Sequence, residues 1–270
     1  MDVAEHTTEV AGLPVHWRRA GAAPVLYVHG VPTASWDWLP FLERIGGVAP
    51  DLPGFGRSGK PGSFDYSIAG YADFLDAFTA AVGLERLTLV VHDWGSVGLA
   101  FAQRRPERIE RLVLFNCVPL LPGYRWHRVA RGWRTPLLGE LLMGLTTKWG
   151  ARQLLREANV AEGPMPQEFV DRVWADFDHG TQRAILRLYR SAPPEVLERA
   201  GGRLAEIRAP ALIQWSTRDP YIPERFGADY AAALGGGATL EPVDDAGHWP
   251  WVDRPDLVDR TAAFIAAGGS

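Results

Sequence analysis

Three residues that are far apart in the sequence could together perform nucleophilic catalysis, namely Asp93, Asp219 and His248. Asp93 stands in Leu-Val-Val-His-Asp-Trp-Gly-Ser (89–96), where an apolar run typical of a buried strand ends at a carboxylate. This stretch has the small-x-nucleophile-x-small form of a sharp strand–turn–helix elbow, with Asp where Ser is commoner. The N-terminus of the next helix would stabilise an ionised carboxylate by roughly 0.3–1 kcal/mol. We therefore expect Asp93 to attack an electrophile, while the alternative is that it merely caps the helix.

A carboxylate nucleophile needs partners, and the sequence offers a candidate for each of them. Hydrolysis of its ester requires oxyanion donors, a base that activates water, and a group that orients the base. His248, in Ala-Gly-His-Trp-Pro, could be the base, and Asp219, in Arg-Asp-Pro-Tyr, could orient its imidazole. The backbone N–H groups of Val31, which follows a His-Gly pair, and of Trp94 could form the oxyanion hole.

The elements that must position these residues alternate between strands and helices. Apolar runs predict strands, and 3.6-residue periodicity predicts helices, one of them with Ser67 as its N-cap. The expected strands are 25–28, 48–49, 87–91, 112–117, 211–215 and 238–242, and the expected helices include 68–82, 95–105 and 257–267. This order predicts a mostly parallel sheet with helices on both faces, whose ligands bind beyond the carboxyl ends of the strands. Asp93, Asp219 and His248 each follow one of these strands.

The alternation breaks between about residues 120 and 205, where the sequence is helical, rich in Trp and punctuated by Pro and Gly. We expect residues 1–119 and 206–270 to form the core and residues 120–205 to form an inserted helical cap.

Composition excludes several other functions. The formal net charge of −4 gives no basic field for nucleic acid, and no His or carboxylate spacing matches a metal site. The N-terminus lacks the pattern of a signal peptide, and no apolar run approaches the roughly 20 residues needed to cross a bilayer. We expect a cytoplasmic monomer or homodimer with no cofactor, no metal and no nucleic-acid or membrane partner.

Several short motifs together resemble the α/β-hydrolases, in the branch that holds epoxide hydrolases and haloalkane dehalogenases. The matching pieces are His29-Gly30-Val31-Pro32, Asp51-Leu52-Pro53-Gly54-Phe55-Gly56-Arg57-Ser58, His92-Asp93-Trp94-Gly95, Asp219 and Gly247-His248-Trp249. The resemblance implies an α/β-hydrolase fold with a mostly parallel eight-stranded sheet, helices on both faces and an inserted helical cap. It also implies that Asp93 forms an alkyl-enzyme ester, which water activated by His248 then hydrolyses.

The two reactions of this branch differ in the group that receives the leaving atom. In the family, cap tyrosines protonate an epoxide oxygen, whereas a halide is held by N–H donors. Those donors are the Trp after the nucleophile together with an Asn or Glu after His-Gly, or a cap Trp. Tyr189, which precedes an Arg, resembles the later cap tyrosine, but Tyr124 lies too early to match the other one. Trp94 is compatible with both reactions, and Val31 has no donor side chain.

We therefore predict an epoxide hydrolase that opens small apolar epoxides to diols, with Tyr189 as an additional catalytic residue. The alternatives are a haloalkane dehalogenase with the same Asp/His/Asp mechanism, another α/β-hydrolase, or a non-catalytic ligand-binding member. The residues expected to line the substrate pocket are Trp36, Trp38, Trp94, Tyr124, Trp133 and Trp249.

Overall fold

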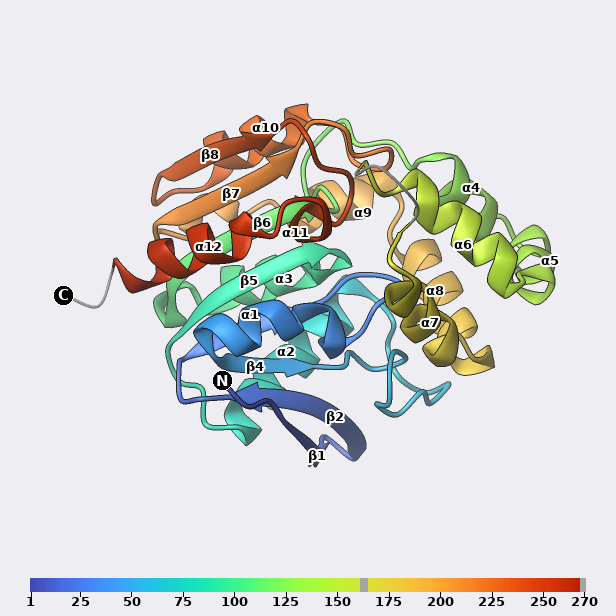
Figure 1. Cartoon of the computed structure of the whole chain (residues 1–270), viewed down its shortest axis with the longest axis horizontal. Coiled ribbons are helices and arrows are strands. Elements are labelled where there is room, and N and C mark those ends of the chain that lie inside the picture. Colours follow the sequence, from blue (N-terminus) through green and yellow to red (C-terminus); the bar gives the residue numbers. More distant parts are fainter. Residues whose placement is uncertain (161–164, 268–270) are drawn as a thin grey trace.

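A computed structural model describes residues 1–160 and 165–267 and contains one eight-stranded sheet (Figure 1). The strand order is β1-β2-β4-β3-β5-β6-β7-β8, in which β1/β2 and β2/β4 are antiparallel and every other pair is parallel. The strands are β1 (Ala4–Val10), β2 (Leu13–Ala20), β3 (Val25–Val28), β4 (Gly47–Pro50), β5 (Leu87–Asp93), β6 (Ile109–Cys117), β7 (Ala211–Ser216) and β8 (Ala238–Val243). The predicted fold class is confirmed.

The N-terminal hairpin of β1 and β2 was not expected from the sequence. β1 forms one edge of the sheet, and most of its residues are exposed, so it lacks the apolar run that identified the central strands. Ala11 and Gly12 join the two strands with φ angles of 50° and 78°. Positive φ at both central residues is the geometry of the tight hairpin turns that match the twist of the strands.

Helices cover both faces of the sheet and bury a separate apolar core on each (Figure 1). One face carries α1 (Leu39–Ile45), α11 (Pro250–Asp253) and α12 (Asp256–Ala266), and the other carries α2 (Ile68–Ala81), α3 (Val97–Arg104) and α10 (Arg225–Ala233). Alternate residues of β5 enter the two cores, with Val90 in one and Leu89 and Val91 in the other. A strand buried on both faces explains the unbroken apolar run that precedes Asp93.

Among the described residues, six α-helices lie between β6 and β7, where the sequence predicts a cap. They are α4 (Arg128–Arg134), α5 (Leu138–Leu145), α6 (Lys148–Glu157), α7 (Gln167–Asp176), α8 (His179–Ser191) and α9 (Pro194–Ala200). Helices α4 to α8 gather beyond the carboxyl ends of the parallel strands (Figure 1). In the described part of the chain, no helix combines the length and the apolarity needed to cross a membrane.

Candidate active site

Asp93 lies at the tip of a strained elbow. It ends β5, and the short 3-10 turn η2 (Trp94–Ser96) and then α3 follow it directly. Its φ of 47° and ψ of −121° lie in a region that a residue with a side chain adopts only at a cost. A Cβ atom on Gly95 would lie 2.1 Å from the carbonyl oxygen of Val28, so only glycine lets the elbow approach β3 this closely. Asp93 makes no capping hydrogen bond to η2, so the carboxylate does not serve as a helix cap.

The two carboxylate oxygens of Asp93 have different surroundings. The backbone N–H of Val31 donates to Oδ2 at 2.8 Å, whereas Oδ1 faces His248 Nε2 at 3.8 Å, beyond hydrogen-bond length. A Cβ atom on Gly30 would lie 2.5 Å from the Cβ of Asp93, so a glycine there lets the loop carrying Val31 reach the carboxylate. Oδ2 is therefore held in place, and Oδ1 is the oxygen available to attack.

His248 and Asp219 form the second half of the site. Nδ1 of His248 and Oδ2 of Asp219 are 2.7 Å apart. The backbone N–H groups of Tyr221 and Ile222 donate to the other oxygen of Asp219, and Asn116 Nδ2 donates to Oδ2 at 2.8 Å. These bonds fix the orientation of Asp219 and, through it, the orientation of the imidazole. Sequence reasoning missed Asn116, although an amide that closes an apolar strand was a usable signal.

For Asp93 and for His248, burial and nearby charges shift the pKa in opposite directions. Burial raises the pKa of Asp93, and the charge of His248 and the N–H groups of Val31 and Trp94 act against that rise. Burial would lower the pKa of His248, but the charge and hydrogen bond of Asp219 and the charge of Asp93 outweigh it and raise this pKa above its usual value. The site therefore stabilises a protonated imidazole beside a carboxylate whose ionised form is poorly solvated.

Asp93 and His248 open onto a mostly apolar cavity of about 100 Å³. Of the residues expected to line a pocket, Tyr124, Trp133 and Trp249 line this cavity, as do Tyr189 and Val31. Residues that the sequence did not single out for this role also line it, among them Trp126, His127, Leu154, Phe177, Ile185, Tyr221 and Ile222. Such a cavity suits a small apolar molecule with one reactive polar group.

Two tyrosines, Tyr124 and Tyr189, are among the residues that line this cavity. The hydroxyl of Tyr124 is buried and has no hydrogen-bond partner among the described residues. Tyr189 is packed between the rings of Trp94 and Trp133, each with its centroid 5.1 Å away. Burial raises the pKa of both tyrosines well above the usual value, and the negative charge of Asp93 adds to this effect. Both hydroxyls therefore stay protonated in the electrostatic field of Asp93.

Three tryptophans that were expected in the pocket lie outside the cavity lining. Trp38 is fully buried against Tyr27, Phe41 and Trp251 in the core between the sheet and α1. Trp94 is also fully buried, because the rings of Trp126 and Tyr189 separate it from the cavity. This corrects the expectation for their side chains, although the backbone N–H of Trp94 still faces Asp93.

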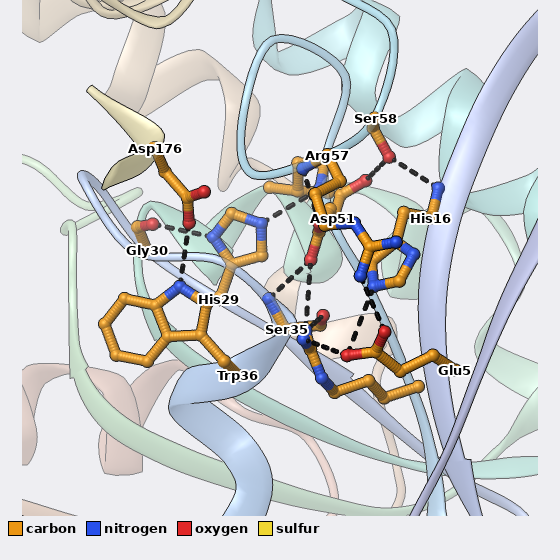
Figure 2. A network of polar contacts seen from close by, with 12 residues as sticks. Glu5, His16, His29, Gly30, Ser35, Trp36, Asp51, Arg57, Ser58 and Asp176 are labelled. Atoms are coloured by element: carbon orange, nitrogen blue, oxygen red, sulfur yellow. Dashed lines mark hydrogen bonds and ion pairs between the residues drawn. The ribbon is translucent and has the colours of Figure 1, made fainter. Parts of the chain in front are cut away.

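Trp36, the third of these tryptophans, belongs to a polar network that supports the loop carrying Val31. Its Nε1 donates to Asp176 Oδ2 of α7 at 2.9 Å (Figure 2), and Trp36 is not among the residues that line the cavity. In the same network, His29 bridges the backbone N–H of Leu52 and the carbonyl oxygen of Gly30 (Figure 2). His29 and Trp36 thus act as structural supports of the loop, and Trp36 also joins the core to the helical segment.

Asp37 is a second residue that sequence reasoning missed. Its carboxyl group is buried, and Trp249 Nε1 donates to its Oδ2 at 3.1 Å. Trp249 lines the cavity, and its ring meets that of His248 edge-on at 4.7 Å. Asp37 therefore fixes the indole that packs against the imidazole. Burial raises the pKa of Asp37 to about 7.

Replacing Asp37 by Asn is expected to remove part of the pH dependence of stability. The carboxyl group titrates near 3.8 when unfolded and near 7 when folded, so the folded state holds the proton more tightly and stability falls as the pH rises through this window. Asp37→Asn should raise the free energy of unfolding at pH 8, relative to wild type, by roughly 2–4 kcal/mol. Urea unfolding at pH 4 and pH 8 measures this, with Asp245→Asn, a change at an exposed carboxylate, as the control. Equal effects of the two variants would contradict the prediction.

The described residues contain no group of three or more His, Cys, Asp or Glu side chains arranged to hold a metal ion. The residues that line the cavity carry a carboxylate, an imidazole and tyrosine hydroxyls among their functional groups.

Comparisons with known proteins agree with this geometry. Residues 23–255 match the family model described as alpha/beta hydrolase fold. A haloalkane dehalogenase of Mesorhizobium japonicum is 33% identical over 90% of this chain and 84% of its own length. Another from Mycolicibacterium paratuberculosis is 38% identical with the same coverage. The crystal structure of haloalkane dehalogenase DbeA from Bradyrhizobium elkani is similar with a TM-score of 0.85, at 26% identity and over 99% of both chains. The similarity therefore includes the helices over the site as well as the sheet.

Proposed function

Since this chain belongs to the alpha/beta-hydrolase family, in the branch of its dehalogenase relatives, we propose that it is an epoxide hydrolase that converts small apolar epoxides to diols. The observation that carries this proposal is the pair of tyrosines, Tyr124 and Tyr189, that share an apolar cavity with Asp93. Their hydroxyl groups are the acidic donors that opening an epoxide requires.

In the first step, Oδ1 of Asp93 attacks one carbon of the epoxide. The carbon–oxygen bond of the ring breaks, and the released oxygen takes its proton from the hydroxyl of Tyr189 or Tyr124. The product is an ester between Asp93 and a hydroxyalkyl group. The poor solvation of the Asp93 carboxylate favours this step, because the ester is neutral.

In the second step, His248 Nε2 removes a proton from a water molecule, which attacks the Cγ atom of Asp93. Negative charge develops on Oδ2, which the N–H of Val31 already binds at 2.8 Å. Asp219 stabilises the imidazolium that forms. The acyl–oxygen bond then breaks, and the leaving alkoxide takes the proton of the imidazolium. The proton of the new Asp93 carboxyl group returns to the tyrosinate formed in the first step, so that the diol leaves and the carboxylate, the imidazole and the tyrosine are all regenerated.

Two of the indoles that line the cavity are not available as halide donors. Trp126 Nε1 donates to the carbonyl oxygen of Ala192 at 2.9 Å, and Trp249 Nε1 donates to Asp37. Val31 offers only its backbone N–H, which already binds Asp93. The hydroxyl of Tyr124 has no such competing partner among the described residues, which favours protonation of an oxygen leaving group over binding of a halide.

Haloalkane dehalogenation is the second candidate function. The two curated relatives described above are named haloalkane dehalogenases. In addition, Trp94 Nε1, on the residue after the nucleophile, is buried, and its interaction with the hydroxyl of Tyr189 falls short of the geometry of a full hydrogen bond. A rearrangement of the Trp126 and Tyr189 rings would be needed to expose this group to a halide.

Replacing the cavity tyrosines by Phe separates the two candidates. For Tyr189→Phe we expect kcat/KM on styrene oxide to fall by about 10²-fold, because the variant loses an acid that protonates the leaving oxygen. For Tyr124→Phe we expect a smaller decrease in kcat/KM on styrene oxide. The double variant should show a larger decrease than either single variant. Diol formation from styrene oxide and bromide release from 1-bromobutane should be measured side by side on each protein.

The control is Tyr27→Phe, which removes a buried hydroxyl that donates to the carbonyl oxygen of Gly46; neither residue lines the cavity. It should leave the rate of diol formation nearly unchanged. Efficient bromide release without diol formation by the wild-type protein would favour the second candidate. Full diol formation by the Tyr124→Phe/Tyr189→Phe double variant would contradict the role of the tyrosines.

A further inference from the structure

Helix α5 turns its apolar side toward solvent. Leu138, Leu141, Leu142 and Leu145 follow the spacing i, i+3, i+4, i+7 and therefore form one stripe along the helix. Their exposed fractions are 43%, 57%, 40% and 69%. In a surface helix such a stripe normally faces the core, but in α5 the buried residues are Gly139 and Met143.

Two further large apolar side chains close to α5 in the sequence are also exposed. Leu137, just before α5, is 84% exposed, and Trp149, in the first turn of α6, is 72% exposed. Together with the four leucines of α5 they form what we call the cap patch. Helix α5 lies at the end of the molecule farthest from the sheet, where it packs against α4 and α8 (Figure 1). All exposed large apolar side chains of the described residues other than Met1 belong to the cap patch.

The segment that carries the cap patch is strongly basic. Residues 120–160 contain seven Lys or Arg residues and two Asp or Glu residues, in a chain with a formal net charge of −4. Arg152 and Arg156 are exposed and lie three and seven positions after Trp149, which places them on the same side of α6. Neither of them, nor Arg131 of α4, forms an ion pair with another described residue.

We propose that the cap patch binds the surface of an anionic phospholipid membrane, with α5 lying in the plane of the interface. Exposed leucines, an exposed tryptophan and flanking arginines are the features by which an amphipathic helix inserts shallowly between lipid headgroups. The cations add attraction to anionic headgroups, which supply the opposite charge that this surface lacks. The expectation of no membrane partner was based on the absence of a spanning segment, and peripheral binding needs none.

The same charges argue against a second copy of the chain as the occupant. In a two-fold dimer the identical surface of each subunit meets its copy, so the unpaired arginines of both would be brought together. Like charges in apposition oppose association unless counter-ions or acidic residues separate them. Binding to an anionic lipid surface brings no like charges together.

The helices next to the cap patch in the sequence also contribute residues to the cavity wall. Trp133 of α4, and Ala151 and Leu154 of α6, line the cavity that contains Asp93. Binding through the cap patch would place these helices at the lipid surface. On the proposed function, the substrates would then be epoxides apolar enough to dissolve in a bilayer.

Sedimentation with sucrose-loaded vesicles tests the binding without any need for turnover. We expect the purified full-length protein to bind vesicles of phosphatidylcholine and phosphatidylglycerol in a 7:3 ratio at least about tenfold more tightly than vesicles of pure phosphatidylcholine. Raising the salt concentration should weaken the binding. Because this assay detects adsorption alone, it can succeed even if no epoxide is hydrolysed.

Paired variants separate the apolar and the charged contributions. Leu141→Asp/Leu145→Asp should abolish measurable binding. Arg152→Gln/Arg156→Gln should weaken it by about 30-fold, since each cation near an anionic surface contributes roughly 1 kcal/mol. The control Arg86→Gln/Arg208→Gln removes two exposed arginines just before β5 and β7, at the opposite end of the strands, and should bind like wild type. Circular dichroism shows whether each variant is folded.

Two results would overturn the proposal. One is the absence of binding to anionic vesicles, or equal binding by the wild type and the Arg152→Gln/Arg156→Gln variant. The other is a dimer of the wild-type protein in analytical ultracentrifugation that Leu141→Asp/Leu145→Asp dissociates, because the cap patch would then be an interface between copies.

Discussion

Replacing Asp93 by alanine is expected to lower kcat for diol formation by more than about 10³-fold. Without the carboxylate no ester can form, and the backbone N–H of Val31 is left without the oxygen that it binds. The variant should fold, because Asp93 makes no capping hydrogen bond and the apolar β5 run that precedes it is unchanged. Diol release measured against time, with circular dichroism of the same sample, checks both expectations.

A labelled-water experiment shows whether Asp93 acts by direct attack. If water attacks the ester at Cγ of Asp93, a single turnover in H₂¹⁸O should place the label in the carboxylate of Asp93, and the first diol should carry none. Mass spectrometry of the peptide containing Asp93 detects the ¹⁸O label in its carboxylate. Asp93→Asn is a useful companion, because slow deamidation would restore both the carboxylate and the activity. Label in the first diol, with none in the protein, would contradict the ester mechanism.

The catalytic core could be predicted because each of its parts has a local sequence signal. The apolar run of β5 that ends at Asp93 reflects a strand buried on both faces, and Gly95 reflects its close approach to the carbonyl oxygen of Val28. Asp219 and His248 follow parallel strands, whose carboxyl ends meet at one edge of a sheet. Neighbouring strands thus brought together residues that are far apart in the sequence.

The wall of the cavity was harder to predict, because it depends on how the helical segment packs over the sheet. Tyr124 lies too early in the chain to match the family's other cap tyrosine, yet it lines the same cavity as Tyr189. Trp36 and Trp38 follow the loop of Val31 directly, but the 3-10 turn η1 (Ser35–Trp38) directs them into other contacts. Spacing along the chain does not determine the direction in which a short irregular turn sends a side chain.

Electrostatic details depend in the same way on tertiary contacts. The sequence Trp-Asp-Trp (36–38) gives no reason to expect a buried carboxyl, and the raised pKa of Asp37 arises because the fold closes over it. The raised pKa of His248 likewise requires Asp219, which lies on a different loop and is held by the amide of Asn116 from β6. Such values follow from the assembled site rather than from any one motif.

Replacing His248 by glutamine is expected to stop the reaction after the first step. Glutamine cannot remove a proton from water, but Oδ1 of Asp93 remains free to attack, so ester should form and then persist. Intact-protein mass spectrometry after mixing with styrene oxide should show one added substrate mass per chain. Steady-state diol formation should fall by more than about 10³-fold.

The wild-type enzyme offers a second measure of the role of His248, because only the neutral imidazole can accept a proton. The pKa of His248 is raised above its usual 6.5, so kcat should fall as the pH decreases through a value above 6.5 in the wild type, and this decrease should disappear in the variant. The double variant Asp93→Ala/His248→Gln is the control and should carry no added mass. A stable adduct in that control, or rapid diol release by His248→Gln alone, would show that the ester on Asp93 is not the intermediate. If His248→Gln forms an adduct with 1-bromobutane and none with styrene oxide, the ester mechanism would still hold. The protein would then be a haloalkane dehalogenase, which is the second candidate function.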